Sequence, residues 1–193
     1  ALLRMRMACD STYLLDPLID EGAKVGEIAN VLEEFFAGEP AGKAVIFSSW
    51  LKMHELVGRA LAQRGWGHVL FHGGVPTKDR GALVQRFKED PACRVFLATD
   101  AGGVGLNLQC ASLVVNADQP WNPAVLEQRI ARLHRLGQTR PVQVVNLVAE
   151  NSIDCRLSYD GRRRSMNRRS AMKPMSNMRS ASSMTSTSMW RRL

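Results

Sequence analysis

The chain has 193 residues, 45% of them hydrophobic, so it can bury one sizeable core but hardly two complete domains. Its longest apolar runs, as in 44–47 and 95–98, are far shorter than the roughly 20 residues that cross a bilayer, which predicts no membrane span. The four cysteines are widely separated and form no metal-binding or redox-pair spacing, so we expect free thiols in a reducing cytoplasm.

The formal net charge is +8, but the excess lies at the end of the chain. Residues 161–193 contain nine Lys or Arg and no acid, which leaves 17 basic and 18 acidic residues in 1–160. Bulk charge therefore indicates nothing about what the folded part binds. The tail, residues 155–193, is rich in Met, Ser and Arg with little from which to build a core, and we expect it to be disordered or loosely helical.

The first half of the chain alternates helical and strand patterns. Residues 1–22 have no sustained period and are interpreted as a connecting arm. An apolar stripe over 28–36 predicts a helix, and 44–47 is a compact apolar strand. A second stripe over 53–61 predicts another helix, and Gly65 stands where a left-handed cap is needed. A strand at 69–71 follows.

The second half continues the alternation. Thr77 begins a predicted helix, and strands are expected at 94–98 and 113–115. Asn122 and Pro123 form a good helix start, and that helix is predicted to run to Gly137. The last predicted strand is 142–148.

Short apolar strands that alternate with amphipathic helices predict an α/β fold of three layers, with a parallel sheet covered on both faces. Ligands of such folds bind at the carboxyl ends of the strands. Three segments rich in polar residues or glycine lie there: 48–50, 72–75 and 99–108.

Residues 128–138 read Gln-Arg-Ile-Ala-Arg-Leu-His-Arg-Leu-Gly-Gln. On a continuous helix, Gln128, Arg132 and Arg135 project within about 60° of one another, opposite an apolar stripe. Guanidinium groups presented in this way suit phosphate oxygens, and an arginine that meets a transferring phosphoryl group is a recurrent catalytic device. The alternative is the solvated face of an ordinary amphipathic helix.

Residues 98–108 pass from a strand into a glycine-rich turn, where backbone donors can approach an anion or a sugar closely. A tight turn without a ligand is the alternative interpretation. The third glycine of a dinucleotide fingerprint is replaced by Leu108, and the chain contains no Walker A loop. The 193 residues by themselves are therefore not expected to hydrolyse ATP.

Four ordered segments together resemble motifs IV, IVa, V and VI of superfamily-2 helicases: 45–50, 71–74, 98–108 and 128–138. More narrowly, Thr-Asp-Ala-Gly-Gly-Val-Gly-Leu-Asn-Leu, Pro-Trp-Asn-Pro-Ala-Val-Leu-Glu-Gln-Arg and Arg-Leu-His-Arg-Leu-Gly-Gln are similar to the second lobe of Swi/Snf-type ATPases. The resemblance covers about 1–154 and implies a RecA-like, P-loop NTPase-like helicase C-terminal lobe over 23–154. The tail departs from the family, which usually continues into an acidic, lysine-rich helix.

The resemblance implies that ATP and Mg²⁺ lie between two lobes, held mainly by an N-terminal lobe of the same protein that this chain does not contain. It implies catalytic arginine fingers at Arg132 and Arg135. ATP-binding residues would be Gln128, Gly103, Gly105 and Asn107. Phosphates of double-stranded DNA would be contacted by Ser48, Ser49, Trp50, His72, Gly73, Gly74 and Thr99, positioning the lobe without reading sequence. No protein metal site is expected in this lobe.

Single residues have other interpretations. Trp50 can start a packed helix, and His72 can be a plain strand-end residue. Trp121 is predicted to be a buried anchor that holds the helix carrying Arg132 and Arg135. The favoured function is one half of a double-stranded-DNA translocase that remodels RNA polymerase or other DNA-bound proteins, in a bacterial cytoplasm or in a nucleus. The alternatives are the second lobe of a DEAD-box-like RNA helicase and a non-catalytic RecA-like interaction module.

Overall fold

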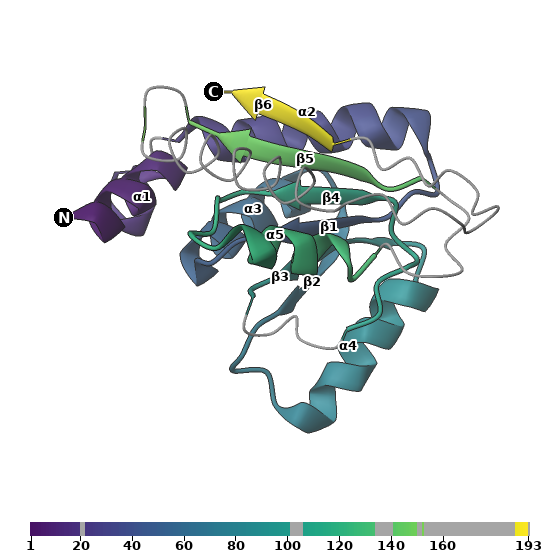
Figure 1. Cartoon of the computed structure of the whole chain (residues 1–193). Helices are drawn as coiled ribbons and strands as arrows, with labels where there is room; N and C mark the ends of the chain where they lie inside the picture. Colours follow the sequence, from purple (N-terminus) through teal and green to yellow (C-terminus); the bar gives the residue numbers. More distant parts are fainter. Residues whose placement is uncertain (20–21, 101–105, 134–140, 150–151, 153–187, 193) are drawn as a thin grey trace, which may run out of the picture.

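The computed structural model describes residues 1–19, 22–100, 106–133, 141–149, 152 and 188–192 (Figure 1). The helices are α1 (Leu2–Asp10), α2 (Ala23–Gly38), α3 (Leu51–Gln63), α4 (Thr77–Glu89) and α5 (Pro123–Ile130), with a 3₁₀ turn, η1, at Thr12–Leu14. The strands are β1 (Ala44–Phe47), β2 (Gly67–Phe71), β3 (Cys93–Ala98), β4 (Leu113–Asn116), β5 (Gln143–Val148) and β6 (Ser188–Arg192).

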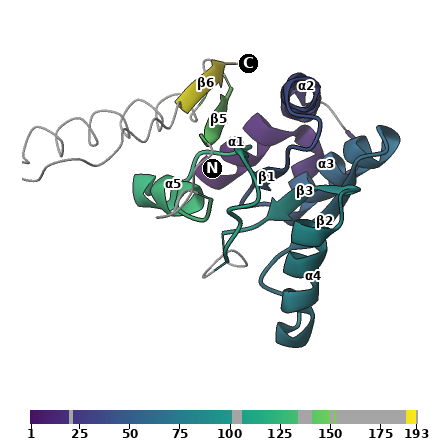
Figure 2. The same ribbon diagram turned by 90° about the vertical axis from the view of Figure 1, so that its right-hand side faces the viewer.

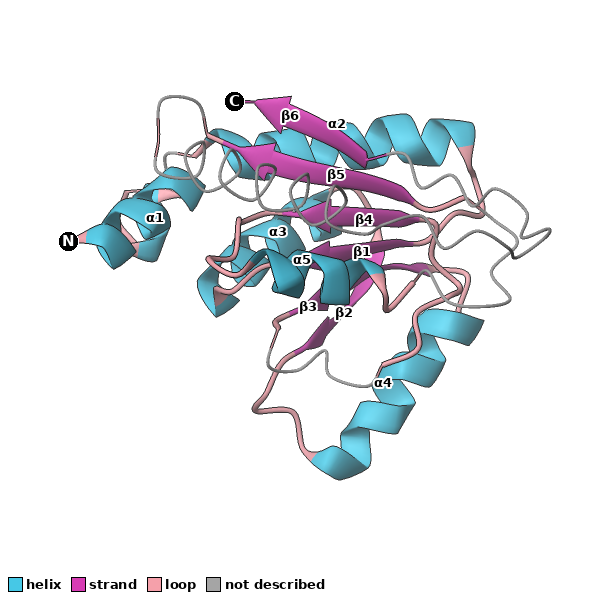
Figure 3. Cartoon of the chain, viewed as in Figure 1, coloured by secondary structure: helices cyan, strands magenta, loops and turns pink. Residues whose placement is uncertain are grey.

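All strand pairs are parallel, and the strand order is β2-β3-β1-β4-β5-β6 (Figure 3). The central strands β1, β3 and β4 are buried on both faces, which explains why apolar residues predominate in their sequences. Ala44 and Ile46 face a core with α2 and α3, while Val45 and Phe47 face a second core that includes Phe87 of α4. Figure 2 shows α2 and α3 on one side of the sheet and α4 and α5 on the other. The predicted three-layer α/β fold is confirmed.

The strand register brings the polar segments to one edge. Phe71, Ala98, Phe47, Asn116 and Asn146 align across β2, β3, β1, β4 and β5. Each of the first four is the last residue of its strand, so these strands end together. The edge that they form is called the carboxyl edge below. Parallel pairing alone therefore gathers segments that are up to about a hundred residues apart in the sequence.

Local signals explain several element ends. Gly65 has φ of +70°, so the predicted left-handed cap of α3 is confirmed. The Asn122 side chain accepts a hydrogen bond from the Ala124 N–H at 3.0 Å, and Pro123 occupies the first turn of α5, as predicted.

Three features differ from the expectations. The arm contains a helix, α1. The helix α5 ends at Ile130, where the sequence predicted a helix to Gly137; residues 131–133 form a turn, and 134–140 lie outside the described residues. The carbonyl of Arg132 accepts from the Leu108 N–H at 3.0 Å, which ties this turn to the chain that follows β3.

The third difference is β6, which comes from a tail that was expected to be disordered or loosely helical. It pairs in parallel with β5. An edge strand such as β5 presents unpaired backbone donors and acceptors, and strand pairing satisfies them through the backbone alone. The rest of the tail, apart from this strand, falls in 153–187 and at 193, outside the described residues.

Candidate functional site

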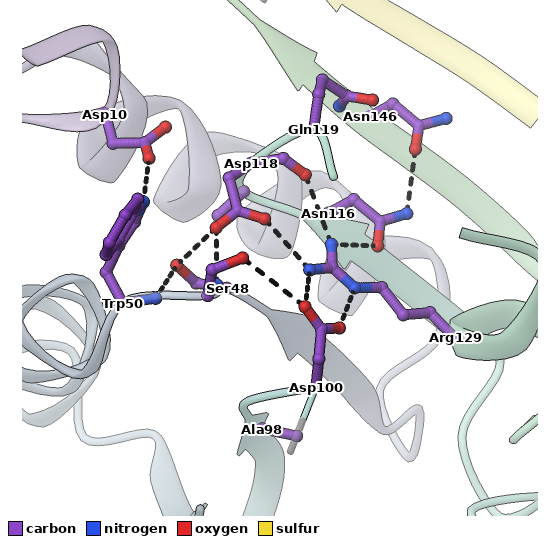
Figure 4. Close-up of polar contacts among 12 residues, drawn as sticks. Asp10, Ser48, Trp50, Ala98, Asp100, Asn116, Asp118, Gln119, Arg129 and Asn146 are labelled. Carbon is purple, nitrogen blue, oxygen red and sulfur yellow. Dashed lines mark hydrogen bonds and ion pairs between the residues drawn. The ribbon is translucent and has the colours of Figure 1, made fainter. Parts of the chain in front are cut away.

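The centre of the carboxyl edge is occupied by Arg129, whose side chain is 2% exposed (Figure 4). Its Nε and Nη2 donate to both oxygens of Asp100 at 2.6 and 2.8 Å. Nη2 also reaches the Asp118 carboxylate at 3.0 Å, and Nη1 donates to Asn116 Oδ1 and to the Asp118 carbonyl at 3.2 and 3.3 Å. A guanidinium has five N–H donors, and these five bonds use them all. Arg129 therefore joins α5 to the ends of β3 and β4.

The surroundings of Asp118 and Arg129 favour the charged form of both side chains. Burial disfavours the charged form of Asp118, but the charge of Arg129 and the hydrogen bonds from Ser49 and Arg129 outweigh it, so the pKa of Asp118 lies below its ordinary value. Burial likewise disfavours the charged form of Arg129, and the hydrogen bonds and charges of Asp100 and Asp118 more than offset it, raising the Arg129 pKa. Asp100 remains about one third exposed at 34%, so the network borders on solvent on this side.

Asp118 also fixes the turn that follows β1. Its Oδ2 accepts from Ser48 Oγ at 3.1 Å and from the Ser49 N–H at 2.5 Å. Ser48 Oγ in turn accepts from the Trp50 N–H at 3.1 Å. One carboxylate thus sets the conformation of 48–50, the segment with the motif IV resemblance.

His54 lies under the same edge and is 1% exposed. Its Nε2 is 3.1 Å from the Ala98 carbonyl and 3.3 Å from the Ser48 carbonyl. Because carbonyls only accept, Nε2 carries the proton, and Nδ1 is a buried acceptor that has no partner among the described residues. Burial lowers the pKa of His54 from 6.5 to about 4. His54 is therefore a neutral link between the ends of β1 and β3.

A buried ion pair attaches the arm to this edge. Lys24 Nζ and Asp10 Oδ1 are 2.6 Å apart, and both side chains are 1% exposed. The other Asp10 oxygen accepts from Trp50 Nε1 at 2.8 Å, and Lys24 also donates to the Ala117 carbonyl at 2.9 Å. Hydrogen bonds of this kind compensate the large cost of burying two charges.

The residues predicted for ATP chemistry are only partly described. Arg132 is half-buried in the turn after α5, and its guanidinium makes no hydrogen bond or ion pair with another described residue. Gln128 and Asn107 are exposed, and Asn107 Oδ1 accepts from the Gln109 N–H at 3.2 Å. Because α5 ends at Ile130, Gln128 and Arg132 do not share a continuous helix face, contrary to the prediction. Three residues lie outside the described ones: Gly103, Gly105 and Arg135.

The residues predicted for DNA divide by exposure. Ser49, Gly73 and Gly74 are exposed, whereas Ser48 and Thr99 are buried. Trp50 is half-buried, packs against the α2–α3 core and has its indole N–H bonded to Asp10. The remaining residue, His72, is half-buried, and its Nδ1 accepts from the Gly74 N–H at 3.1 Å. Their role in DNA binding stays a prediction.

Trp121 is not a buried anchor, and that prediction is wrong. The side chain is 52% exposed, and the Arg6 guanidinium lies 5.2 Å from its ring centroid. The sequence placed Trp121 between Pro120 and Asn122 without showing that this connection runs along the surface. The helix α5 is instead held by Arg129.

Sequence reasoning missed the residues that organise the edge: Asp10, Lys24, His54, Asp100, Asn116, Asp118 and Arg129. One signal was present, since Asp100 and Asp118 each follow a buried strand by two residues, where a parallel sheet gathers its polar groups. No such signal marked Arg129, which a helical projection places beside the residues of the apolar stripe.

The described residues contain no group of three or more His, Cys, Asp or Glu side chains arranged to hold a metal ion. No described helix is long and apolar enough to cross a membrane.

The fold and the edge define the class of the protein, a RecA-like α/β lobe. The solved structure of the C-terminal part of the Fun30 ATPase domain superimposes on this chain with a TM-score of 0.67 and 28% identity. The match covers 70% of this chain and 44% of that one.

The chain belongs to the helicase conserved C-terminal domain family, whose profile matches residues 26–137. Relatives include an uncharacterized ATP-dependent helicase of Schizosaccharomyces pombe, 36% identical over 74% of this chain, and the chromatin-remodeling ATPase INO80 of Saccharomyces cerevisiae, 34% identical over 76%. These matches confirm the resemblance to Swi/Snf-type ATPases. The aligned region is 14% and 10% of the length of these two relatives, so it spans only a small part of them.

Proposed function

We propose that this chain is the second lobe of an ATP-dependent double-stranded-DNA translocase. In this proposal Arg132 and Arg135 are the arginine fingers, and Gln128, Gly103, Gly105 and Asn107 line the ATP. The residues that contact DNA phosphates are drawn from three segments, 48–50, 72–74 and Thr99. The family and the ATP-dependent helicases among its relatives support the use of ATP.

One observation carries the proposal, the contrast between two arginines of one motif. The Arg129 guanidinium uses all five donors inside the lobe, whereas the Arg132 guanidinium has no hydrogen-bond or ion-pair partner among the described residues. No nitrogen of the Arg132 side chain is among the buried, unpartnered polar atoms of the described residues, so this guanidinium reaches solvent and is open to a further acceptor. A phosphate of ATP held by a first lobe is tetrahedral, and two of its oxygens can accept a pair of hydrogen bonds from the planar guanidinium.

The chemistry of the described donors fits the phosphate end of ATP. Guanidinium and amide groups neutralise or bind phosphate oxygens. In the proposal, Mg²⁺ is held mainly by the first lobe together with ATP. When water attacks the γ-phosphorus and the bond to the β-phosphate oxygen breaks, Arg132 would stabilise the charge on the transferring group.

The groups proposed to contact DNA are held in place by hydrogen bonds within the lobe. Ser49 is exposed, and its backbone is fixed by Asp118. Gly74 donates to His72 Nδ1, so the neutral ring carries its proton on Nε2, a donor suited to a phosphate oxygen. A Cβ on Gly74 would approach the His72 ring to 3.0 Å, which explains a glycine there. Such contacts position a protein on DNA without reading its sequence.

The name of INO80 describes a chromatin-remodeling ATPase. By relation, we propose that the whole protein acts on DNA-bound proteins and that its place is the nucleus. The relatives reported above are eukaryotic and give no support to the bacterial cytoplasm.

The test uses a protein in which this chain is joined to a Swi/Snf-type first lobe, with the 193 residues alone as control. We expect ATP hydrolysis by the two-lobe protein to rise with duplex DNA and the isolated chain to show none. Greater stimulation by RNA than by duplex DNA would favour the RNA-helicase alternative. No hydrolysis under any condition would favour the non-catalytic interaction module.

A further inference from the structure

Three consecutive carbonyls after β4 are each bound by a basic side chain of a different helix. Lys24 of α2 donates to the first carbonyl of 117–119 at 2.9 Å, and Arg129 of α5 donates to the second at 3.3 Å. Arg6 of α1 donates to the third at 2.6 Å. Charged donors from three separate parts of the fold therefore converge on one connecting segment.

The same segment has contacts on its other side. The Asp118 side chain holds Ser48 and Ser49 after β1, and Gln119 Nε2 donates to the Leu147 carbonyl of β5 at 3.2 Å. Residues 117–119 thus contact the arm, α5 and the 48–50 turn, which is proposed to contact DNA.

The arm reaches that turn by a second route. Asp10 of α1 accepts from Lys24 and from the Trp50 indole, and Figure 4 shows the contact with Trp50. Both ends of the 48–50 turn therefore depend on groups tied to α1. Any displacement of α1 must therefore stretch short, buried, charge-assisted bonds or move the 48–50 turn with it.

We propose that residues 117–119 are a relay through which the position of the arm sets the DNA-contacting turn, and that Arg6 is the positioning residue that couples α1 to this relay. The proposal rests on the proposed function, and it takes the arm, residues 1–22, as the connection from the first lobe. Closure of the two lobes moves α1, and the pull passes through Arg6 to 117–119 and through Asp118 to Ser49.

The environment of Arg6 is suited to this role. Its side chain is 5% exposed, although α1 is otherwise a largely exposed helix. It makes the bond to the Gln119 carbonyl and a cation–π contact with Trp121, and its Nε has no hydrogen-bond partner among the described residues. Arg4, two residues earlier on the same helix, is exposed and supplies a control of equal charge.

The decisive experiment is amide hydrogen exchange on the 193-residue chain carrying Arg6→Gln, with Arg4→Gln as the matched control. The Ser49 N–H donates to Asp118, and the carbonyl of the next residue, Gln119, accepts from Arg6. Two hydrogen bonds therefore separate Ser49 from Arg6. We expect its exchange to accelerate about fivefold in the Arg6 variant, at the lower end of typical coupling between sites, and to be unchanged in the control. Arg6→Lys, which keeps a charged donor, should recover part of the protection.

Amide exchange in β3, which shares no bond with Arg6, measures whether the variant is destabilised as a whole. Equal acceleration at Ser49 and in β3, or no acceleration at Ser49, would overturn the relay and leave Arg6 with a purely structural role. In the two-lobe protein, Arg6→Gln should lower the stimulation by duplex DNA about fivefold while the DNA-free turnover and the KM for ATP stay unchanged. A parent protein that duplex DNA does not stimulate rejects the proposed function, whereas the exchange result alone decides the relay.

Discussion

Arg129 and Arg132 stand three residues apart in one motif and have opposite environments. Arg129 is buried and gives all of its donors to Asp100, Asn116 and Asp118. Arg132 lies in the turn after α5 and bonds to no described acceptor through its guanidinium. One basic motif thus holds an arginine that is used inside the lobe and another whose guanidinium has no described acceptor.

The largest effect is expected at Arg132. In the two-lobe protein, Arg132→Ala should reduce the turnover number about a thousandfold, as loss of an arginine finger does in other phosphoryl-transfer enzymes. The measurement is steady-state ATP hydrolysis with saturating duplex DNA. A turnover within twofold of the parent would reject the assignment of Arg132 as a finger.

The same comparison predicts a different result at Arg129. Arg129→Ala leaves Asp118 buried without its cation, so the free energy of unfolding should fall by about 3–5 kcal/mol. Urea denaturation of the 193-residue chain measures this, and Arg132→Ala should stay within about 0.5 kcal/mol of the parent in the same assay. Equal losses in both variants would remove the distinction between the two arginines.

The pH dependence of stability tests the role of buried His54 at the carboxyl edge. Because its pKa is lowered to about 4, the unfolded chain binds a proton that the folded chain excludes as the pH falls from 6.5 toward 4. Stability should therefore decrease over that window, by at most about 3 kcal/mol from this residue. His54→Gln, which keeps an amide donor, should flatten the decrease in urea denaturation curves. A decrease that is the same in the variant would assign it to other groups.

The smallest effect is expected at Trp121. Its exposed ring contributes a contact with Arg6, so Trp121→Ala should cost about 0.5–1 kcal/mol of unfolding free energy. Phe47→Ala, at a fully buried position of β1, is the matched comparison and should cost about 3–5 kcal/mol. A loss at Trp121 as large as that at Phe47 would restore its role as an anchor.

Much of the fold could be predicted from local pattern. The five strands between 44 and 148 lie where apolar runs were recognised, and Gly65 and Asn122 end and begin helices for conformational reasons that one residue supplies. The site was predicted less completely. Its segments were identified as lying at the carboxyl ends of strands. The ion pair of Asp10 with Lys24 could not be predicted, because nothing in the sequence of α1 or of α2 indicates that these two side chains meet.

The sequence by itself determined the alternation of strands and helices, the parallel three-layer fold and the family, because each depends on local periodicity or on the order of motifs. Only the tertiary structure decided which arginine is buried, where α5 ends and that the arm is bound to the carboxyl edge. Those outcomes depend on which donor meets which acceptor across the sheet. That choice is made by strand register and packing of the whole chain, and no window of neighbouring residues contains it.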